Sequence, residues 1–236
     1  TKQNNNQATE EQYNVQRALY MIRRDAIKKG IKAPVANLTD PGFREVMFGP
    51  LSRSKKLTRT DEDIRVAVNL WCTNRDAAEK QYGHISDWDV SSVTNMGELF
   101  AGKTTFNDDI SRWDVSNVTN MLAIFYHAHA FNQPVRDWDV SKVTDMESMF
   151  RSAASFNQPL AAWDVSKVTD MGSMFYGAAS FNQPLAAWDV SKVTDMEWMF
   201  RSAASFNQPL AAWDVSKVTD MEWMFRSAAS FNQPLA

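Results

Sequence analysis

The chain contains 236 residues, 44% of them hydrophobic, and carries a formal net charge of −3. This length provides for one large or two small domains with hydrophobic cores. The absence of any run of about 18 apolar residues excludes a membrane-spanning helix, and the single cysteine excludes an internal disulfide.

Charge is unevenly distributed along the chain. Residues 1–60 contain 12 lysines and arginines against 5 aspartates and glutamates, a net charge of +7, whereas residues 61–236 contain 13 against 23, a net charge of −10. A basic part joined to an acidic body indicates two parts with different roles. We predict a basic helical extension over 1–60, a helical cap over 61–83 and a repeat region over 84–236.

Residues 9–30 are predicted to form the helix of the extension. Thr9 and Gln12 match a capping box, and Gly30 is placed to end the helix. Its basic side chains form either a solvated helix face or a docking site for an acidic protein, and no aromatic–basic interleaving favours nucleic acid. For the docking alternative the candidate residues are Arg23, Arg24, Lys28 and Lys29.

The cap is predicted from a second apolar stripe at helical spacing. The stripe consists of Ile64, Ala67, Val68 and Trp71. We expect this helix to cover the open end of the first repeat, as the terminal caps of repeat proteins do.

From residue 84 onward the sequence repeats with a period of 25 residues. The block 181–205 recurs letter for letter at 206–230, and the copy before them differs at four positions. The motif Trp-Asp-Val-Ser marks each unit and begins at Trp88, Trp113, Trp138, Trp163, Trp188 and Trp213. Six units and the first six residues of a seventh are present, a pattern typical of proteins whose units stack.

Each unit is predicted to contain a strand, a turn and a short helix. Trp163 and Val165 alternate as residues on one face of a strand do. The following Thr-Asp-Met-Glu, present in most copies, matches a capping box. The next apolar residues have helical spacing, as in Met146, Met149, Phe150 and Ala153.

Stacking such units predicts an α/β repeat fold, a leucine-rich-repeat-like solenoid of six 25-residue strand-turn-helix units. Stacked strands lie about 4.8 Å apart whereas packed helices need about 8–10 Å, so the stack should curve with its strands inside. The last repeat is incomplete, and its uncapped coil offers an edge for end-to-end self-association.

Two rows of polar side chains follow from the repeat. The asparagine after the opening phenylalanine of each unit is predicted to satisfy turn backbone groups. The aspartates after the tryptophans would lie about 5 Å apart, where like charges repel by roughly 1 kcal/mol in water. Asx-turn hydrogen bonds with nearby lysines are one explanation of this row, and binding of cations or a basic ligand is the other. The row consists of Asp89, Asp114, Asp139, Asp164, Asp189 and Asp214.

Trp198 and Trp223 are predicted to be exposed. They lie about 200° around the predicted helix from its buried stripe, and earlier copies hold polar or small residues at this position. Two exposed tryptophans on neighbouring units would form an apolar patch, which is either a protein-binding contact or a tolerated accident.

No residue pattern indicates catalysis. We interpret His84, His127 and His129 as structural or solvent-exposed, since no third metal ligand accompanies them. The chain contains no Gly-rich phosphate loop, nucleophile elbow or HExxH motif. We therefore expect no enzyme activity, no cofactor and no metal.

Units such as "FNQPLAAWDVSKVTDM" resemble the BspA-like leucine-rich-repeat surface protein family, with the 25-residue repeats of mycoplasma surface lipoproteins. The segment "DEDIRVAVNLWCTNRDAAEKQYGHISDWDVSSVTNM" resembles the N-terminal flank of that family. The resemblance covers about residues 61–236. It implies a cell-surface or secreted protein that acts in adhesion or recognition.

The functional prediction is a non-enzymatic, protein-binding repeat solenoid with a partner of unknown identity, acting in surface adhesion or recognition. Interchangeable coils add length and surface without redesign, which suits this role. The alternative is a structural or scaffold subunit inside a large assembly, anchored by its basic N-terminal segment. Residues 1–60 favour this alternative, because surface repeats do not require them.

Overall fold

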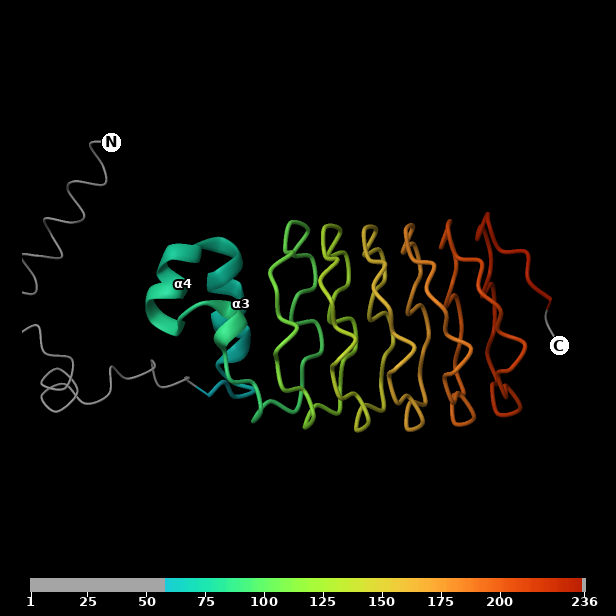
Figure 1. Ribbon diagram of the computed structural model, residues 1–236, viewed down its shortest axis with the longest axis horizontal. Helices are drawn as coiled ribbons and strands as arrows, with labels where there is room; N and C mark the ends of the chain where they lie inside the picture. Colours follow the sequence, from blue (N-terminus) through green and yellow to red (C-terminus); the bar gives the residue numbers. More distant parts are fainter. Residues whose placement is uncertain (1–57, 235–236) are drawn as a thin grey trace, which may run out of the picture. The chain divides into compact units, whose positions relative to one another are not determined.

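The structure is a computed structural model that describes residues 58–234 (Figure 1). The described residues belong to one compact unit, Ser54–Ala236. They begin with helix α3 (Ile64–Thr73), helix α4 (Arg75–Tyr82) and the 3-10 helix η1 (Ile85–Asp87). The helix predicted over 9–30 lies outside the described residues.

Helix α3 packs its apolar stripe into the core and contacts the first repeat through polar groups. The buried members of the stripe are Ile64, Ala67, Val68 and Trp71. The guanidinium of Arg65 donates to the carbonyl oxygen of Gly97 at 2.6 Å. Asp61, just before the helix, accepts hydrogen bonds from the backbone N–H and the hydroxyl of Thr94 at 2.8 and 2.6 Å. These bonds fix the helix against the first repeat.

Helix α4 follows after one residue, Asn74. The side chain of Asn74 accepts a hydrogen bond from the N–H of Ala77 at 3.2 Å, which satisfies a free donor at the start of the helix. The helix ends at Gly83, whose φ of +73° lies in the left-handed region that glycine adopts without strain.

After η1 the chain forms a stack of coils, one for each 25-residue unit (Figure 1). We number the coils one to six by their tryptophans, from Trp88 to Trp213. Equivalent backbone groups of successive coils bond to each other: the N–H of Thr144 donates to the carbonyl oxygen of Thr119 at 3.1 Å, and the N–H of Thr169 to that of Thr144 at 3.0 Å. Side chains that are equivalent in sequence therefore lie in columns along the stack.

The predicted strands are absent. Residues 58–234 contain no β-strand: successive coils share one isolated parallel bridge each, and their other backbone hydrogen bonds to each other do not extend it into a strand. Turns on both sides of the Trp-Asp-Val motif explain this, because the N–H of Trp163 donates to Leu160 at 3.0 Å and that of Val168 to Val165 at 2.9 Å. Trp163 and Val165 are both buried as predicted, but the segment between the turns is too short for a ladder.

The predicted helices of the repeat units are absent as well. Among the described residues, the α-helices are α3 and α4, which precede the first coil. The apolar side chains with helical spacing are nevertheless fully buried: Met146, Met149, Phe150 and Ala153. The prediction of a leucine-rich-repeat-like solenoid of strand-turn-helix units is therefore wrong. The predicted curvature of the stack loses its cause as well, because the described coils contain no wide helical layer.

Hydrogen bonding between coils explains why turns replace the helix. The N–H of Met149 donates three residues back, to Met146 at 3.2 Å, but the N–H of Ser148 donates to Gly172 in the next coil at 2.8 Å. An α-helix would direct every such N–H four residues back within the same segment. Ser148 also has a φ of +54°, a left-handed conformation that an α-helix does not contain.

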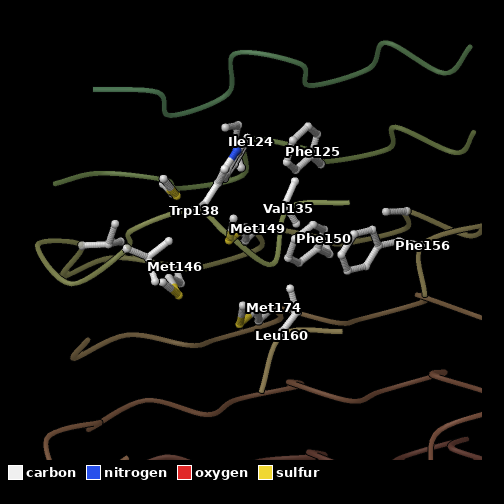
Figure 2. Packing of buried hydrophobic residues seen from close by; sticks show 14 of the residues in the cluster. Ile124, Phe125, Val135, Trp138, Met146, Met149, Phe150, Phe156, Leu160 and Met174 are labelled. Atoms are coloured by element: carbon white, nitrogen blue, oxygen red, sulfur yellow. The ribbon is translucent and has the colours of Figure 1, made fainter. Parts of the chain in front are cut away.

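Columns of stacked aromatic rings form the core of the coils. Phe125 and Phe150 of successive coils have ring centroids 5.6 Å apart, and Phe150 stacks on Phe156 at 3.9 Å (Figure 2). The indole of Trp138 is buried among them and donates its Nε1–H to the carbonyl oxygen of Ile110 at 3.3 Å. Each coil thereby covers the apolar faces of its neighbours, which a single unit could not do alone.

A column of asparagines bonds successive turns, as predicted. The Oδ1 atom of Asn107 accepts from the backbone N–H of Asn132 at 2.9 Å, and the carbonyl oxygen of Asn107 accepts from the Nε2 of Gln133 at 3.0 Å. The arrangement recurs in each following coil up to Asn232. The amides thus satisfy the turn backbone, which confirms the role predicted for this row.

Candidate functional site

One segment of the coils varies between copies that are otherwise identical. Compared with the block at 181–205, the copy at 156–180 differs only at Gly172, Ser173, Tyr176 and Gly177. We call these four positions and their equivalents in the other coils the variable strip. It begins with Gly97 in the first coil and ends with Ser227 in the sixth.

The backbone of the turns aligns the variable strip along the stack. The second strip position donates its N–H to the next coil, as from Ser173 to Glu197 at 2.7 Å and from Trp198 to Glu222 at 2.9 Å. This position is left-handed in all six described coils, although none of them has glycine there: Glu98, Ala123, Ser148, Ser173, Trp198 and Trp223. Equivalent side chains therefore project from the same turn in every coil.

Trp198 and Trp223 lie side by side in the strip. Their ring centroids are 6.1 Å apart with planes 12° from parallel, and Trp223 is 45% exposed while Trp198 is partly exposed. Their φ angles are +57° and +52°. A left-handed conformation costs a non-glycine residue about 1–2 kcal/mol and is rare for a bulky side chain. Local backbone preference therefore does not explain tryptophan at this position.

Arginines cover the rings of the strip. The guanidinium carbon of Arg201 lies 5.1 Å from the ring centroid of Trp198 and 5.0 Å from that of Trp223, and Arg226 lies 4.4 Å from Trp223. Cation–π contacts at such distances are worth about 0.5–1 kcal/mol at exposed sites. The arginines thus hold the two indoles in an ordered surface.

The same pattern extends into the preceding coils. Arg151 lies 4.5 Å above the ring of Tyr176 and 5.6 Å above that of Tyr126, and Arg201 lies 5.3 Å from Tyr176. Alternating arginine and aromatic side chains therefore run continuously from the second coil to the sixth.

The arginines of the strip have no carboxylate partner within the described part of the chain. Ion pairs there join Arg59 to Asp63, Arg75 to Asp108 and Arg136 to Asp137. Arg151, Arg201 and Arg226 form none, although a glutamate lies four residues before each of them. Arg151 and Arg201 are partly exposed and Arg226 is exposed, so their guanidinium groups can donate hydrogen bonds to a negatively charged partner.

A column of carboxylates runs beside the strip. Asp170 belongs to it and accepts the N–H of Gly172 at 2.9 Å. Burial, followed by the charges of Asp195 and Asp145, raises the pKa of Asp170. Burial raises the pKa of Glu197 too, with contributions from Asp220 and Asp195. The column consists of Asp145, Asp170, Asp195 and Asp220, and the first two coils hold Asn95 and Asn120 instead.

The aspartates predicted as a cation or ligand row lie in a different turn. Asp164 is exposed and accepts the backbone N–H of Ser166 at 3.1 Å, and hydrogen bonds from Ser166 lower its pKa. All six aspartates accept this bond from the N–H two residues on, with Oδ1–N distances of 3.0–3.2 Å; the other five are Asp89, Asp114, Asp139, Asp189 and Asp214. Within residues 58–234 no group of three or more His, Cys, Asp or Glu side chains is placed to hold a metal ion. Binding of a cation or basic ligand by this row stays a prediction.

The remaining candidates lie apart from the strip or outside the described residues. Arg23, Arg24, Lys28 and Lys29 belong to residues that the structure does not describe. The exposed Cys72 lines an open pocket of about 470 Å³ together with Arg75, Lys103 and Asp108. Although the residue is exposed, neighbouring atoms partly shield its thiol from water, and this desolvation raises the pKa of Cys72 and favours its protonated, less reactive form.

Sequence reasoning selected the two tryptophans and missed the arginines between them. A signal was present, since the four substitutions between otherwise identical copies include Tyr176 in place of arginine. The helical interpretation concealed it. On a helix, residues four apart such as Glu197 and Arg201 form an ordinary surface pair, and nothing would mark the arginine as free.

Comparison with known proteins identifies the family. A family model described as "Mycoplasma protein of unknown function, DUF285" matches residues 70–175 and 159–236. No curated protein and no solved structure matches the chain. Among the described helices none is long and apolar enough to cross a membrane. This match confirms the resemblance to mycoplasma proteins at the level of the family. It does not confirm the resemblance to BspA-like leucine-rich-repeat proteins. Since the two matches together span well over half of the chain, the protein belongs to the DUF285 family of mycoplasma proteins of unknown function.

Proposed function

We propose that the protein is a non-enzymatic repeat protein that binds other proteins through the variable strip. One observation carries the proposal: the differences between otherwise identical neighbouring copies are confined to the strip, and they exchange serine, glycine and tyrosine for tryptophan, glutamate and arginine. The core columns and hydrogen-bond rows are kept at the same time. Variation of a surface on an unchanged scaffold is what recognition requires.

The chemistry of the strip supports protein binding. Tryptophan, tyrosine and arginine dominate the binding energy of protein interfaces, and all three occur here in mutual contact. The left-handed backbone at Trp198 and Trp223 also supports a binding role. A residue that strains its own backbone persists where the side chain serves another purpose.

The absence of an enzyme activity is part of the proposal. A catalytic site needs one coil to differ from its neighbours in chemistry, with a nucleophile or acid–base pair in contact. The strip instead repeats the same residue types in several coils. Repetition increases contact area and valency, which serve binding.

We place the protein at the cell surface or in the secreted fraction, on the strength of its resemblance to mycoplasma surface repeat proteins. Protease treatment of intact cells tests this. Release of the peptide FNQPLAAWDVSK from living cells is expected. Appearance of the peptide only after lysis would favour the internal scaffold instead.

Replacement of both tryptophans tests the binding surface. The double variant Trp198→Ser, Trp223→Ser restores the residue that Ser148 and Ser173 hold at the same left-handed position, so the coils should fold unchanged. We expect binding to surface-protein partners, measured by quantitative pull-down with the purified chain, to fall about tenfold or more.

A matched control uses the same two coils. Lys192→Ser with Lys217→Ser removes two exposed side chains outside the strip and should leave binding intact. Equal binding by the tryptophan variant and the wild-type chain would contradict the proposed surface.

A further inference from the structure

We infer that the variable strip pairs with the variable strip of a second copy of this chain, the two stacks lying side by side and running in the same direction. The inference rests on the proposed function, because it names a partner for the same strip. Four observations lead to it: co-occurring charges, their lack of pairing within one chain, their arrangement in columns, and a register that the sequence specifies.

Charges at the first and third strip positions occur together. Three coils have glutamate at the first position and arginine at the third: Glu147 with Arg151, Glu197 with Arg201, and Glu222 with Arg226. The other three coils have neither charge: Gly97 with Ala101, Leu122 with Tyr126, and Gly172 with Tyr176. In the fourth coil both charges are missing although both flanking coils carry them.

Within the chain these co-occurring charges act on each other only at a distance: the charge of Arg151 lowers the pKa of Glu147, against larger contributions from burial and carboxylates that raise it. None of the three glutamates forms an ion pair with the arginine four residues on, within the part that the structure describes. On a helix, residues with this spacing would meet. Here a left-handed residue, such as Trp198 between Glu197 and Arg201, turns the backbone and separates them. A common partner outside the chain explains why they occur together.

The columns have the symmetry of a two-fold pair. Because equivalent residues align along the stack, the glutamates lie in one column and the arginines in another, and the position of Trp198 and Trp223 comes between them in the sequence. A two-fold axis parallel to the stack places the glutamate column of each copy opposite the arginine column of the other, and brings the tryptophans together at the centre. An axis across the stack would set glutamate against glutamate. Charge complementarity therefore selects copies that run in the same direction.

The sequence also specifies the register of the pair. When equal coils face each other, all three charged coils meet charged coils, and the fourth coil, with Gly172 and Tyr176, meets itself. A slip by one coil leaves only the fifth coil opposite the sixth with matched charges. A shifted pair would therefore leave charges without a partner of opposite sign, and such a penalty is how an interface discriminates against the wrong register.

The electrostatics of the glutamates agree with this pairing. Burial and the neighbouring carboxylates raise the pKa of Glu147 and of Glu197, with a smaller opposite effect of Arg151 on Glu147, which shows that negative charge is concentrated on this side of the strip. Arginines of a second copy would neutralise it. The association should therefore weaken with added salt and with acid, since both reduce the attraction between the columns.

Charge reversal of the full chain tests the inference. One variant carries Glu147→Arg, Glu197→Arg and Glu222→Arg, and the other carries Arg151→Glu, Arg201→Glu and Arg226→Glu. Sedimentation equilibrium up to about 1 mM covers the range in which a small interface associates. We expect the wild type to form a dimer, each variant alone to associate at least about tenfold more weakly, and an equimolar mixture of the two to recover a heterodimer.

Two further sets of variants serve as controls, one for misfolding and one for charge effects outside the strip. Glu197→Gly with Arg201→Tyr, and Glu222→Gly with Arg226→Tyr, give the fifth and sixth coils the charge-free pair of the fourth, and should weaken association in coils known to accept those residues. Lys167→Glu, Lys192→Glu and Lys217→Glu reverse three exposed charges outside the strip and should leave association unchanged.

The outcomes separate this inference from the proposed function. Association of either reversed variant as tight as that of the wild type overturns the inference, as does failure of the mixture to associate. A wild-type chain that stays monomeric to about 1 mM, yet loses other protein partners when Trp198 and Trp223 become serine, overturns the inference and leaves the proposed function in place.

Discussion

At the scale of single residues, two aspartates of the fourth coil respond to pH in opposite directions. Burial and neighbouring carboxylates raise the pKa of Asp170 above its ordinary value of 3.8, whereas hydrogen bonds from Ser166 lower the pKa of Asp164. A group whose folded-state pKa is raised contributes stability below its unfolded pKa and loses it as the pH rises through the folded pKa. For the lowered pKa, the contribution is present above the unfolded pKa and disappears as the pH falls through the folded one.

Asp170→Asn should therefore stabilise the protein at neutral pH. Asn95 and Asn120 hold the same position in the first two coils and make the same hydrogen bond, with Asn120 accepting from the N–H of Leu122 at 3.0 Å. The variant keeps the acceptor and removes the charge. We expect the free energy of unfolding at pH 7 to rise by on the order of 0.5 kcal/mol, with no gain below about pH 4, measured by calorimetry.

Asp164→Asn serves as the matched comparison, because its ionised form is the favoured one. This variant should lower the free energy of unfolding at neutral pH, by less than about 0.5 kcal/mol for so exposed a group, and the loss should vanish in acid. A change of the same sign in both variants would contradict the assignment of the two pKa directions.

At the scale of the element, the turn segment depends on residues with positive φ. The fourth strip position is left-handed in every described coil, with glycine in two of them and Ser202 at +56° in the fifth. Gly177 holds the same position in the fourth coil, with a φ of +66°. The backbone at this position is set by bonds to the next coil and tolerates side chains only at a cost.

Substitutions at Ser202 should therefore change the free energy of unfolding in opposite directions, depending on whether the new residue tolerates a positive φ. Ser202→Gly relieves the left-handed strain but adds chain entropy to the unfolded state, for a net gain of about 0.5 kcal/mol. Ser202→Val, which is β-branched, should lose about 1–2 kcal/mol. Urea unfolding followed by tryptophan fluorescence measures both, and equal stability of the glycine and valine variants would argue against strain at this position.

The turn segment also shows what sequence could and could not predict. Spacing of apolar residues identified which side chains are buried, since Met146, Met149 and Phe150 are inside. It could not distinguish a helix from successive turns, because both place those side chains on one side. The deciding bond, from Ser148 to Gly172, joins residues of different coils and leaves no local trace. The glycines at 102 and 177 were the one local sign of left-handed backbone.

The same limit applies to the candidate site. Polar and small residues at equivalent positions of earlier copies drew attention to Trp198 and Trp223 from sequence alone. The contacts of Arg201 with both indoles depend on two coils lying next to each other in register. The alternation of the Trp-Asp-Val segment likewise predicts a strand, because the turns that interrupt it depend on backbone bonds that periodicity does not report.

At the scale of the whole molecule, the repeat makes a coil a removable unit. The blocks 181–205 and 206–230 are identical, so every contact across a deletion of 181–205 has an equivalent in the intact protein. Stability of such stacks is approximately a sum of unit and neighbour terms.

Deletion of residues 181–205 should therefore yield a folded protein with five coils. The dependence of its free energy of unfolding on denaturant concentration should decrease in proportion to the surface that the deleted coil would expose on unfolding. The free energy of unfolding itself should fall modestly. Deletion of 181–192 alone would misalign the columns after that point, and we expect it to unfold the coils that follow. Loss of cooperative unfolding in the full-coil deletion would show that the coils are not equivalent.

The turn-only backbone of the coils has a consequence for spectroscopy. Described residues outside the short N-terminal helices lack the regular φ and ψ repeats that give far-ultraviolet circular dichroism its familiar bands. A fully folded stack would then give a spectrum close to that of a coil-like chain, and loss of the far-ultraviolet signal would be a poor measure of unfolding. The stacked phenylalanines and buried indoles lie at fixed angles to one another, so the near-ultraviolet region is where the native state becomes visible.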